Sequence, residues 1–120
     1  GFPSPAQDYV ERTLDLNELC IQRPAATYLV KVQGDSMIEA GIYPGDILVV
    51  DRSLHARHGD VVIASVDAEL TVKRLQLRPT VALHPCNKAY RPIELADDSE
   101  LEIMGVAVHA IRNLRKASSA

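Results

Sequence analysis

Cysteine, long apolar runs and excess positive charge are all scarce in this sequence. Only Cys20 and Cys86 occur among its 120 residues, which is too sparse for the disulfide framework of a small secreted protein. No apolar run approaches the roughly 20 residues that a membrane span needs, and the first residues lack the charged-then-apolar pattern of a signal peptide. We therefore expect a soluble, cytoplasmic chain with reduced thiols and no membrane partner.

The charge balance excludes a general attraction to nucleic acid. Lysine and arginine number 13 against 16 aspartates and glutamates, which gives a net charge of −3. A chain with this balance has no overall positive field to attract a phosphate backbone. We expect no direct sequence-specific contact with nucleic acid, and any link to DNA would run through protein partners.

Nucleotide-binding and metal-binding motifs are also missing. The glycines at 41 and 45 are isolated and do not lead a helix, so neither a P-loop nor a dinucleotide fingerprint is present. Four residues have spacings that partly resemble a metal site, but a structural zinc site needs four ligands at paired spacings. Loop histidines explain the pattern better, and we expect no metal or cofactor; the four residues are His55, His58, His84 and Cys86.

The length fits one domain with short terminal extensions. Prolines and mixed polarity predict an extended arm at 1–14, and we expect a folded domain at 15–113 and a flexible tail at 114–120. The sequence turns basic at Arg112 and then small and polar, which predicts that the terminus frays from there. Asp15 followed by Glu18 is typical of a helix start, so we predict one short helix that ends before Pro24.

From position 27 onward the sequence favours strands. Short segments rich in β-branched residues alternate with turn residues, which predicts a mainly β domain. Asp67-Ala68 has the length of a tight hairpin turn, although Ala68 lacks the tolerance of glycine for positive φ. The last segment is apolar on both faces, so it is central in the sheet or buried at a dimer interface. The predicted strands are 28–32, 47–50, 61–66, 70–77, 80–84, 93–95 and 101–111.

Ser36 and Lys73 are the best candidates for catalysis. Ser36 follows a strand and a glycine, so its hydroxyl could be presented at a sharp turn as a nucleophile. Lys73 lies in a strand on the same face as Leu75 and Leu77, where burial would lower its pKa and let the neutral amine act as general base. The structural alternatives are a serine that caps its own turn and a lysine that extends its charge to water.

Two further hypotheses concern the surroundings of this serine. Gly34 permits close backbone approach, and the backbone N–H groups of Asp35 and Ser36 could form an oxyanion hole if the Asp35 carboxylate turns away. A Ser-His-Asp triad is the weaker alternative, because Ile38 replaces the last glycine of a Gly-x-Ser-x-Gly elbow. Its members would be Ser36 with His55 or His58 and with Asp51 or Asp60.

Several short motifs together resemble the LexA/UmuD family of self-cleaving Ser/Lys peptidases. The resemblance runs from Gly1 to about Arg112 and includes both catalytic blocks in the family order. It implies a strongly bent, antiparallel β-clip fold like that of LexA and signal peptidase, with Ser36 as nucleophile and Lys73 as general base. The motifs are Gly34–Met37, Tyr43–Asp46, His58–Asp60, Thr71–Leu75, Leu77–Thr80 and Pro85–Tyr90.

The resemblance also implies a biological role. In the family a RecA-like recombinase filament on single-stranded DNA stimulates cleavage of a Cys-Gly bond near the N-terminus during the SOS response. The first residues here, Gly1-Phe2-Pro3-Ser4-Pro5, resemble the start of the cleaved product. We therefore expect the processed protein, with little activity left, to form a homodimer that joins a UmuC-like Y-family polymerase subunit in error-prone translesion synthesis.

Three alternatives remain open. The chain could be the C-terminal cleavage and dimerisation domain of a LexA-like or phage repressor, which would carry a helix-turn-helix upstream. It could be a signal peptidase, although the missing apolar anchor counts against this. It could also be a non-catalytic β module in which Ser36 and Lys73 are structural.

Overall fold

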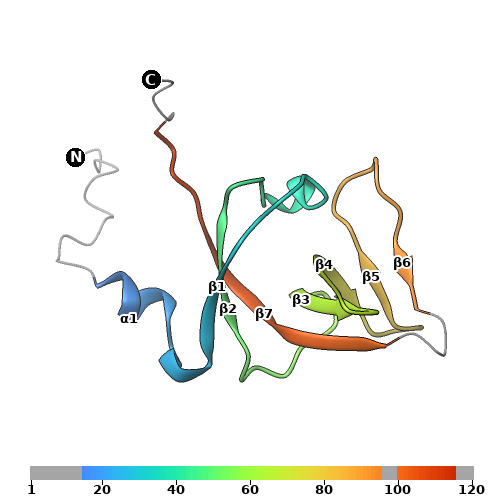
Figure 1. The fold of residues 1–120 in the computed structure, drawn as a ribbon, viewed down its shortest axis with the longest axis horizontal. Helices are drawn as coiled ribbons and strands as arrows, with labels where there is room; N and C mark the ends of the chain where they lie inside the picture. The colour runs from blue at the N-terminus through green and yellow to red at the C-terminus, as the bar shows by residue number, and fades with distance from the viewer. Residues whose placement is uncertain (1–14, 96–99, 116–120) are drawn as a thin grey trace, which may run out of the picture.

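The computed structural model describes residues 15–95 and 100–115, and these form one seven-stranded sheet in which every pairing is antiparallel (Figure 1). The prediction of a mainly β fold with one short N-terminal helix is confirmed. The elements are α1 (Leu16–Cys20), η2 (Pro24–Ala26), β1 (Thr27–Lys31), η3 (Ile38–Ala40), β2 (Ile47–Asp51), β3 (Val61–Val66), β4 (Glu69–Gln76), β5 (Ala82–His84), β6 (Ile93–Glu94) and β7 (Leu101–Ile111).

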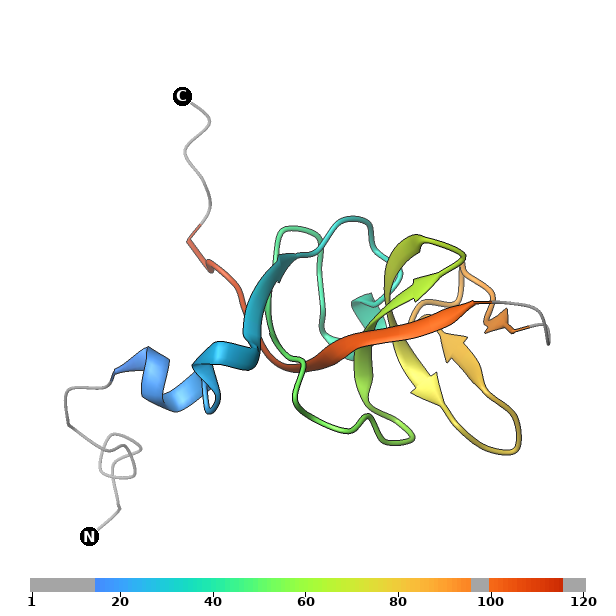
Figure 2. The same ribbon diagram turned by 60° about the horizontal axis from the view of Figure 1, so that its bottom comes forward.

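Strand β7 joins the two halves of the sheet. Its residues 101–106 pair with β3 and its residues 106–111 pair with β2, which gives the strand order β1-β2-β7-β3-β4-β5-β6. Figures 1 and 2 show it running from the β5 and β6 side of the molecule to the β1 and β2 side. The pairing register shifts opposite Val49/Val50 and again opposite Ile63/Ala64, so the sheet is irregular at both junctions. Of the two places predicted for this strand, the central one is confirmed.

The tight hairpin between β3 and β4 is also confirmed. Asp67 and Ala68 have φ angles of 48° and 70°, as a turn with two central residues of positive φ requires. Ala68 therefore adopts a backbone conformation that the sequence alone disfavours. Neighbouring contacts hold this turn, because the Asp67 N–H donates to the Glu100 carbonyl and the Asp67 carboxylate accepts from the Glu100 N–H, both at 3.0 Å.

Helix α1 begins and ends where the sequence predicts. The Asp15 side chain accepts from the Asn17 N–H at 2.9 Å, and the helix ends at Cys20, before Pro24. The two 3₁₀ helices, η2 and η3, were not predicted. Within the described ranges no helix is long and apolar enough to cross a membrane.

Two buried clusters form the core. The first joins β1, β2 and β3 to the segment after β1, and it includes Met37 and Ile42. The second lies around Val62, Leu75 and Leu83, on β3, β4 and β5. The predicted arm at 1–14 lies outside the described residues, as do positions 116–120 of the predicted tail, and the predicted domain division stays a prediction.

Candidate active site

A cleft of about 210 Å³ lies between the end of β1 and the first half of β4. Residues 30–34 and 36–37 line one side, and Leu70–Lys73 line the other. Ser36 and Lys73, which stand 37 positions apart in the sequence, thus come to the same cleft from two different elements.

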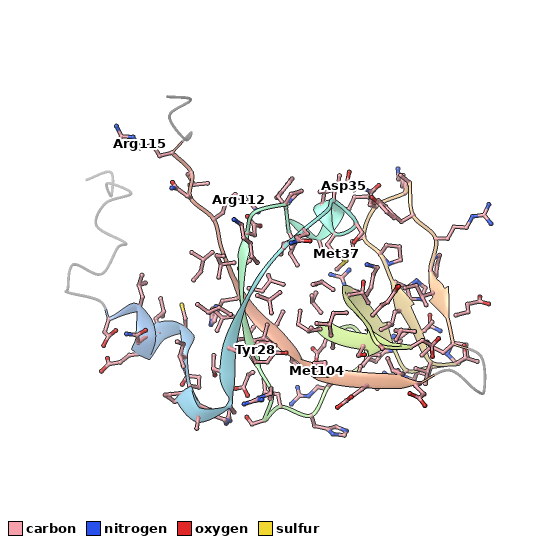
Figure 3. All side chains as sticks on the ribbon, in the orientation of Figure 1. Tyr28, Asp35, Met37, Met104, Arg112 and Arg115 are labelled. Carbon is pink, nitrogen blue, oxygen red and sulfur yellow. The ribbon has the colours of Figure 1, made fainter. Side chains whose placement is uncertain are left out.

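The turn that carries Ser36 is held at both ends. Before it, the Val32 N–H donates to the Asp46 carbonyl at 2.8 Å and so continues the β1–β2 ladder. After it, the Met37 side chain is 2% exposed and packs in the first core cluster. Figure 3 shows Met37 directed inward beneath the turn and Asp35 on its outer side.

The reason for a glycine at position 34 differs from our expectation. A Cβ added to Gly34 would have no atom within 4 Å, so close backbone approach is not what this position requires. Its φ angle is +76°, in the left-handed region that side chains other than glycine rarely adopt. The glycine therefore lets the chain turn sharply between β1 and Ser36.

Lys73 contacts the serine directly. Its Nζ lies 3.1 Å from Ser36 Oγ, 2.6 Å from Thr71 Oγ1 and 3.1 Å from the Val72 carbonyl oxygen. The side chain is partly buried, whereas the next residue, Arg74, is exposed, as the predicted alternation requires. Burial lowers the pKa of Lys73 below its ordinary value of 10.5, and the nearby Cys86 opposes this effect. Sequence reasoning included Thr71 in the 71–75 motif but assigned it no role.

A loop between β5 and β6 supports the serine turn from outside. The Cys86 N–H donates to the Ser36 carbonyl at 2.7 Å, and the Glu39 N–H donates to the Cys86 carbonyl at 2.7 Å. The Tyr90 hydroxyl donates to Asp35 Oδ1 at 2.5 Å, which draws the carboxylate towards this loop. The sequence motif at 85–90 pointed to this segment but not to these contacts.

The predicted oxyanion hole remains a hypothesis about backbone N–H groups. Within the described residues, the N–H groups of Asp35 and Ser36 donate to no acceptor. Neither N–H group is thus occupied by an acceptor from the described part of the chain.

The alternative Ser-His-Asp triad finds no support in the geometry. Among the described residues, the side-chain partner of Ser36 Oγ is Lys73 and not a histidine. His58 Nδ1 accepts from the Leu77 N–H at 2.9 Å, just beyond the end of β4 and away from the cleft residues 70–73. Asp51 is buried and bonded to Ser53 and Arg23, so it has its own structural partners.

The structure also places the cysteines and one of the histidines that were considered as metal ligands. Residues 15–95 and 100–115 contain no group of three or more His, Cys, Asp or Glu that could hold a metal ion. Cys20 and Cys86 are free thiols and are not bonded to each other. His84 Nε2 lies 2.6 Å from Gln76 Oε1, which gives this histidine a partner within the sheet.

Arg112 contradicts the expectation that the chain frays from this residue. Its guanidinium donates to the buried Asp46 carboxylate at 2.7 and 2.8 Å and to the Gly41 carbonyl at 2.6 Å. It also lies over the Tyr43 ring, 4.2 Å from the centroid. Asp46 Oδ2 also accepts from the Tyr43 N–H at 2.9 Å. Sequence reasoning missed the arginine, which stands 66 positions from Asp46.

Comparison with known proteins then decides the family. The family described as Peptidase S24-like matches residues 1–108, nearly the whole chain. The chain belongs to this family. Its membership makes it a relative of the LexA-type serine peptidases, which agrees with a serine and a lysine in hydrogen-bonding distance.

Individual relatives agree with this assignment. Protein SamA of Salmonella typhimurium is 52% identical over 115 residues, which cover 96% of this S24-like chain and 80% of SamA. Protein MucA of Escherichia coli is 49% identical over 112 residues, which cover 92% of this chain and 77% of MucA. A LexA repressor of Alcanivorax borkumensis is 48% identical over 115 residues, but the match covers only 55% of that repressor. The resemblance to the LexA/UmuD family is thus confirmed.

Proposed function

We propose that Ser36 and Lys73 form a catalytic dyad that cleaves a peptide bond in the chain's own precursor. Ser36 Oγ attacks the carbonyl carbon and its proton passes to Lys73 Nζ. The lysine then gives this proton to the leaving amine, and water hydrolyses the acyl-enzyme by the reverse transfers. The distance of 3.1 Å between the two side-chain atoms is the observation that carries the proposal.

The surroundings of Lys73 suit a neutral amine. A neutral amine has two N–H bonds and one lone pair, and the two other acceptors near Nζ are Thr71 Oγ1 and the Val72 carbonyl. With both N–H bonds directed to these acceptors, the lone pair is left for the Ser36 hydroxyl proton. Burial favours this neutral form, because it lowers the pKa of Lys73.

The unbonded N–H groups of Asp35 and Ser36 would stabilise the oxyanion of the tetrahedral intermediate. Preorganised donors of this kind often contribute the largest single part of the rate enhancement. Ser36 would thus supply both its Oγ and its backbone N–H, while Asp35 would supply only its N–H.

An extended peptide fits the cleft. Residues 69–73 of β4 pair with β3 on one side and with no described strand on the other. β1 is the outer strand of the sheet, so its side facing away from β2 also lacks a partner among the described residues. A substrate strand between 30–34 and 70–73 could therefore form backbone hydrogen bonds beside the dyad.

Self-cleavage of the precursor tests the proposed reaction. The full-length protein, with its native upstream residues, is incubated at increasing pH and the products are followed by gel electrophoresis and mass spectrometry. We expect cleavage to accelerate as Lys73 loses its proton, and to be abolished by Ser36→Ala and by Lys73→Ala. Ser53→Ala is the matched control, because Ser53 bonds to Asp51 outside the cleft. Cleavage that persists in Ser36→Ala would overturn the proposal.

We further propose that the domain forms a homodimer through the outer face of β1, β2 and β7. In the pairing register, Leu29 and Ile111 lie on the same face as Ile47, opposite the face that enters the first core cluster. Leu29 is 60% exposed and Ile111 is 45% exposed. Residues 107–111 of β7 also pair with β2 alone among the described strands, so a second copy could add to this edge.

Sedimentation tests the dimer. We expect Ile111→Asp to convert the dimer to a monomer, because the charge would be buried without a partner at the interface. Leu77→Asp is the control, because Leu77 is 40% exposed at the other side of the sheet. A wild-type chain that sediments as a monomer, or an Ile111→Asp variant that remains dimeric, would contradict this interface.

The dimer is proposed to serve as accessory subunit of a UmuC-like Y-family polymerase after a RecA-like filament stimulates self-cleavage. The support is the LexA/UmuD resemblance and the 49–52% identity to SamA and MucA. The test is ultraviolet-induced mutation in bacteria that lack their own protein of this type. The wild-type precursor should restore mutation and the Ser36→Ala precursor should not; equal restoration by both would refute the link between cleavage and mutagenesis.

A further inference from the structure

The loop that contains Asn87 helps to fix the direction of a peptide group beside the nucleophile. Asn87 Nδ2 donates to the Asp35 carbonyl at 2.9 Å, and the Ile38 N–H donates to the same oxygen at a longer 3.4 Å. The C=O and N–H bonds of a trans peptide group point in opposite directions. Because the Asp35 carbonyl is directed towards Asn87, the Ser36 N–H, which belongs to the same peptide group, is directed away from this loop.

Tyr90 holds the side chain of Asp35 in place. Its hydroxyl donates to Asp35 Oδ1 at 2.5 Å, and this bond raises the pKa of Tyr90 above its ordinary value. A carboxylate that turned back towards the Ser36 N–H would compete for that donor and would repel negative charge developing there. The hydroxyl thus holds the charge of Asp35 on the outer side of the turn.

We propose that Asn87 and Tyr90 are positioning residues for the oxyanion hole. Asn87 aims the Ser36 N–H, and Tyr90 keeps the Asp35 carboxylate away from it. Neither side chain forms a hydrogen bond to Ser36 Oγ or Lys73 Nζ, so both act through Asp35 and not on the reacting atoms. This inference rests on the proposed function of the dyad.

Asn87→Ser removes the proposed donor and retains the local turn. Asn87 Oδ1 accepts from the Ala89 N–H at 2.9 Å, and a serine hydroxyl can replace that acceptor but is too short to reach the Asp35 carbonyl. Asn113→Ser is the matched control, because Asn113 Oδ1 accepts from the Arg115 N–H at the same 2.9 Å. Figure 3 shows Arg115 at the upper left, well away from Asp35.

The assay is phosphonylation of Ser36 by a fluorophosphonate, which needs no substrate peptide. Ser36 Oγ forms a bond to phosphorus, fluoride leaves, and the hydroxyl proton passes to Lys73. The negative charge on the phosphonyl oxygen uses the same N–H donors as a peptide oxyanion. Labelling rates are measured from neutral to alkaline pH, and mass spectrometry identifies the labelled residue.

Asn87→Ser is expected to lower the plateau labelling rate by about tenfold or more, since small displacements of catalytic groups have large effects on rate. The pH midpoint should stay that of the wild type, because Lys73 is untouched. Tyr90→Phe should lower the plateau by a smaller factor, and Asn113→Ser should leave it unchanged. The unfolding temperature of each variant should match that of the wild type.

Two results would overturn the inference and leave the proposed dyad standing. The first is a plateau labelling rate in Asn87→Ser that equals that of the wild type. The second is a lower plateau rate that comes with a shifted pH midpoint or a lowered unfolding temperature. Absence of labelling at Ser36 in the wild type is a different result, because it would remove the proposed function itself and this inference with it.

Discussion

Replacement of Gly105 by alanine tests the close packing of β7 against β2. A Cβ at this position would lie 2.5 Å from Val50 Cγ1 and 3.3 Å from both the Asp51 carbonyl oxygen and the Tyr28 hydroxyl oxygen. Carbon atoms in contact prefer about 3.5–4.0 Å, so the two groups must separate by roughly 1 Å. Val50 is 0% exposed and its β-branched side chain is stiff, so it cannot simply rotate away.

Overpacking of this kind costs about 1–3 kcal/mol of unfolding free energy. The Tyr28 hydroxyl is part of the cost, because it donates to the neighbouring Met104 carbonyl at 3.0 Å (Figure 3). For a domain of this size, each kcal/mol lowers the unfolding temperature by about 4–8 °C.

Urea denaturation of four proteins, the wild type, Gly105→Ala, Val50→Ala and the double variant, separates the clash from other effects. Val50→Ala removes the methyl group that the new Cβ meets, so Gly105→Ala should cost at least about 1 kcal/mol less in that background. A change within about 0.5 kcal/mol for Gly105→Ala alone, or additive effects in the double variant, would refute the reasoning.

Two further predictions concern charged groups. Lys73→Met should abolish phosphonylation of Ser36. Its unfolding free energy at pH 7 should equal or exceed that of the wild type, because burial disfavours the ammonium. A loss of more than about 1 kcal/mol of unfolding free energy, measured by urea denaturation, would contradict this. The hydrogen bond from Arg112 holds the pKa of Asp46 below its ordinary 3.8. The pair therefore stabilises the folded chain above pH 3.8, and this contribution is lost as the pH falls through the lower pKa of the folded state. Arg112→Met should therefore be destabilised at pH 7, and its deficit relative to the wild type should shrink in acid, where Asp46 is protonated; a deficit that is constant with pH would contradict this.

Local patterns predicted most strands because each strand's burial follows from its own residues. β7 is mostly apolar, with buried residues at its centre, which suits a strand that lies between two others. The hairpin at Asp67-Ala68 was predicted by its length alone. Its turn was harder to predict, because the backbone and carboxylate of Asp67, next to Ala68, are bonded to Glu100, which is distant in the sequence.

The candidate dyad was accessible from sequence because each member breaks a local pattern. Ser36 follows a glycine at the end of a strand, and Lys73 is a cation on an apolar strand face. The contacts of Thr71 and of the 86–90 loop were not predicted, although both lie in motifs, because these contacts depend on where β4 and β5 meet the serine turn. Arg112 was misjudged for the same reason, since its partner Asp46 is 66 positions away.

The pH dependence of Ser36 phosphonylation is the most direct test of the central claim. The dyad predicts that a fluorophosphonate labels Ser36, that the rate rises with pH to an inflection below the ordinary lysine value of 10.5, and that Lys73→Ala removes this inflection. Ser53→Ala should behave as the wild type. A rate at Ser36 that is the same in Lys73→Ala as in the wild type across this pH range would contradict the account.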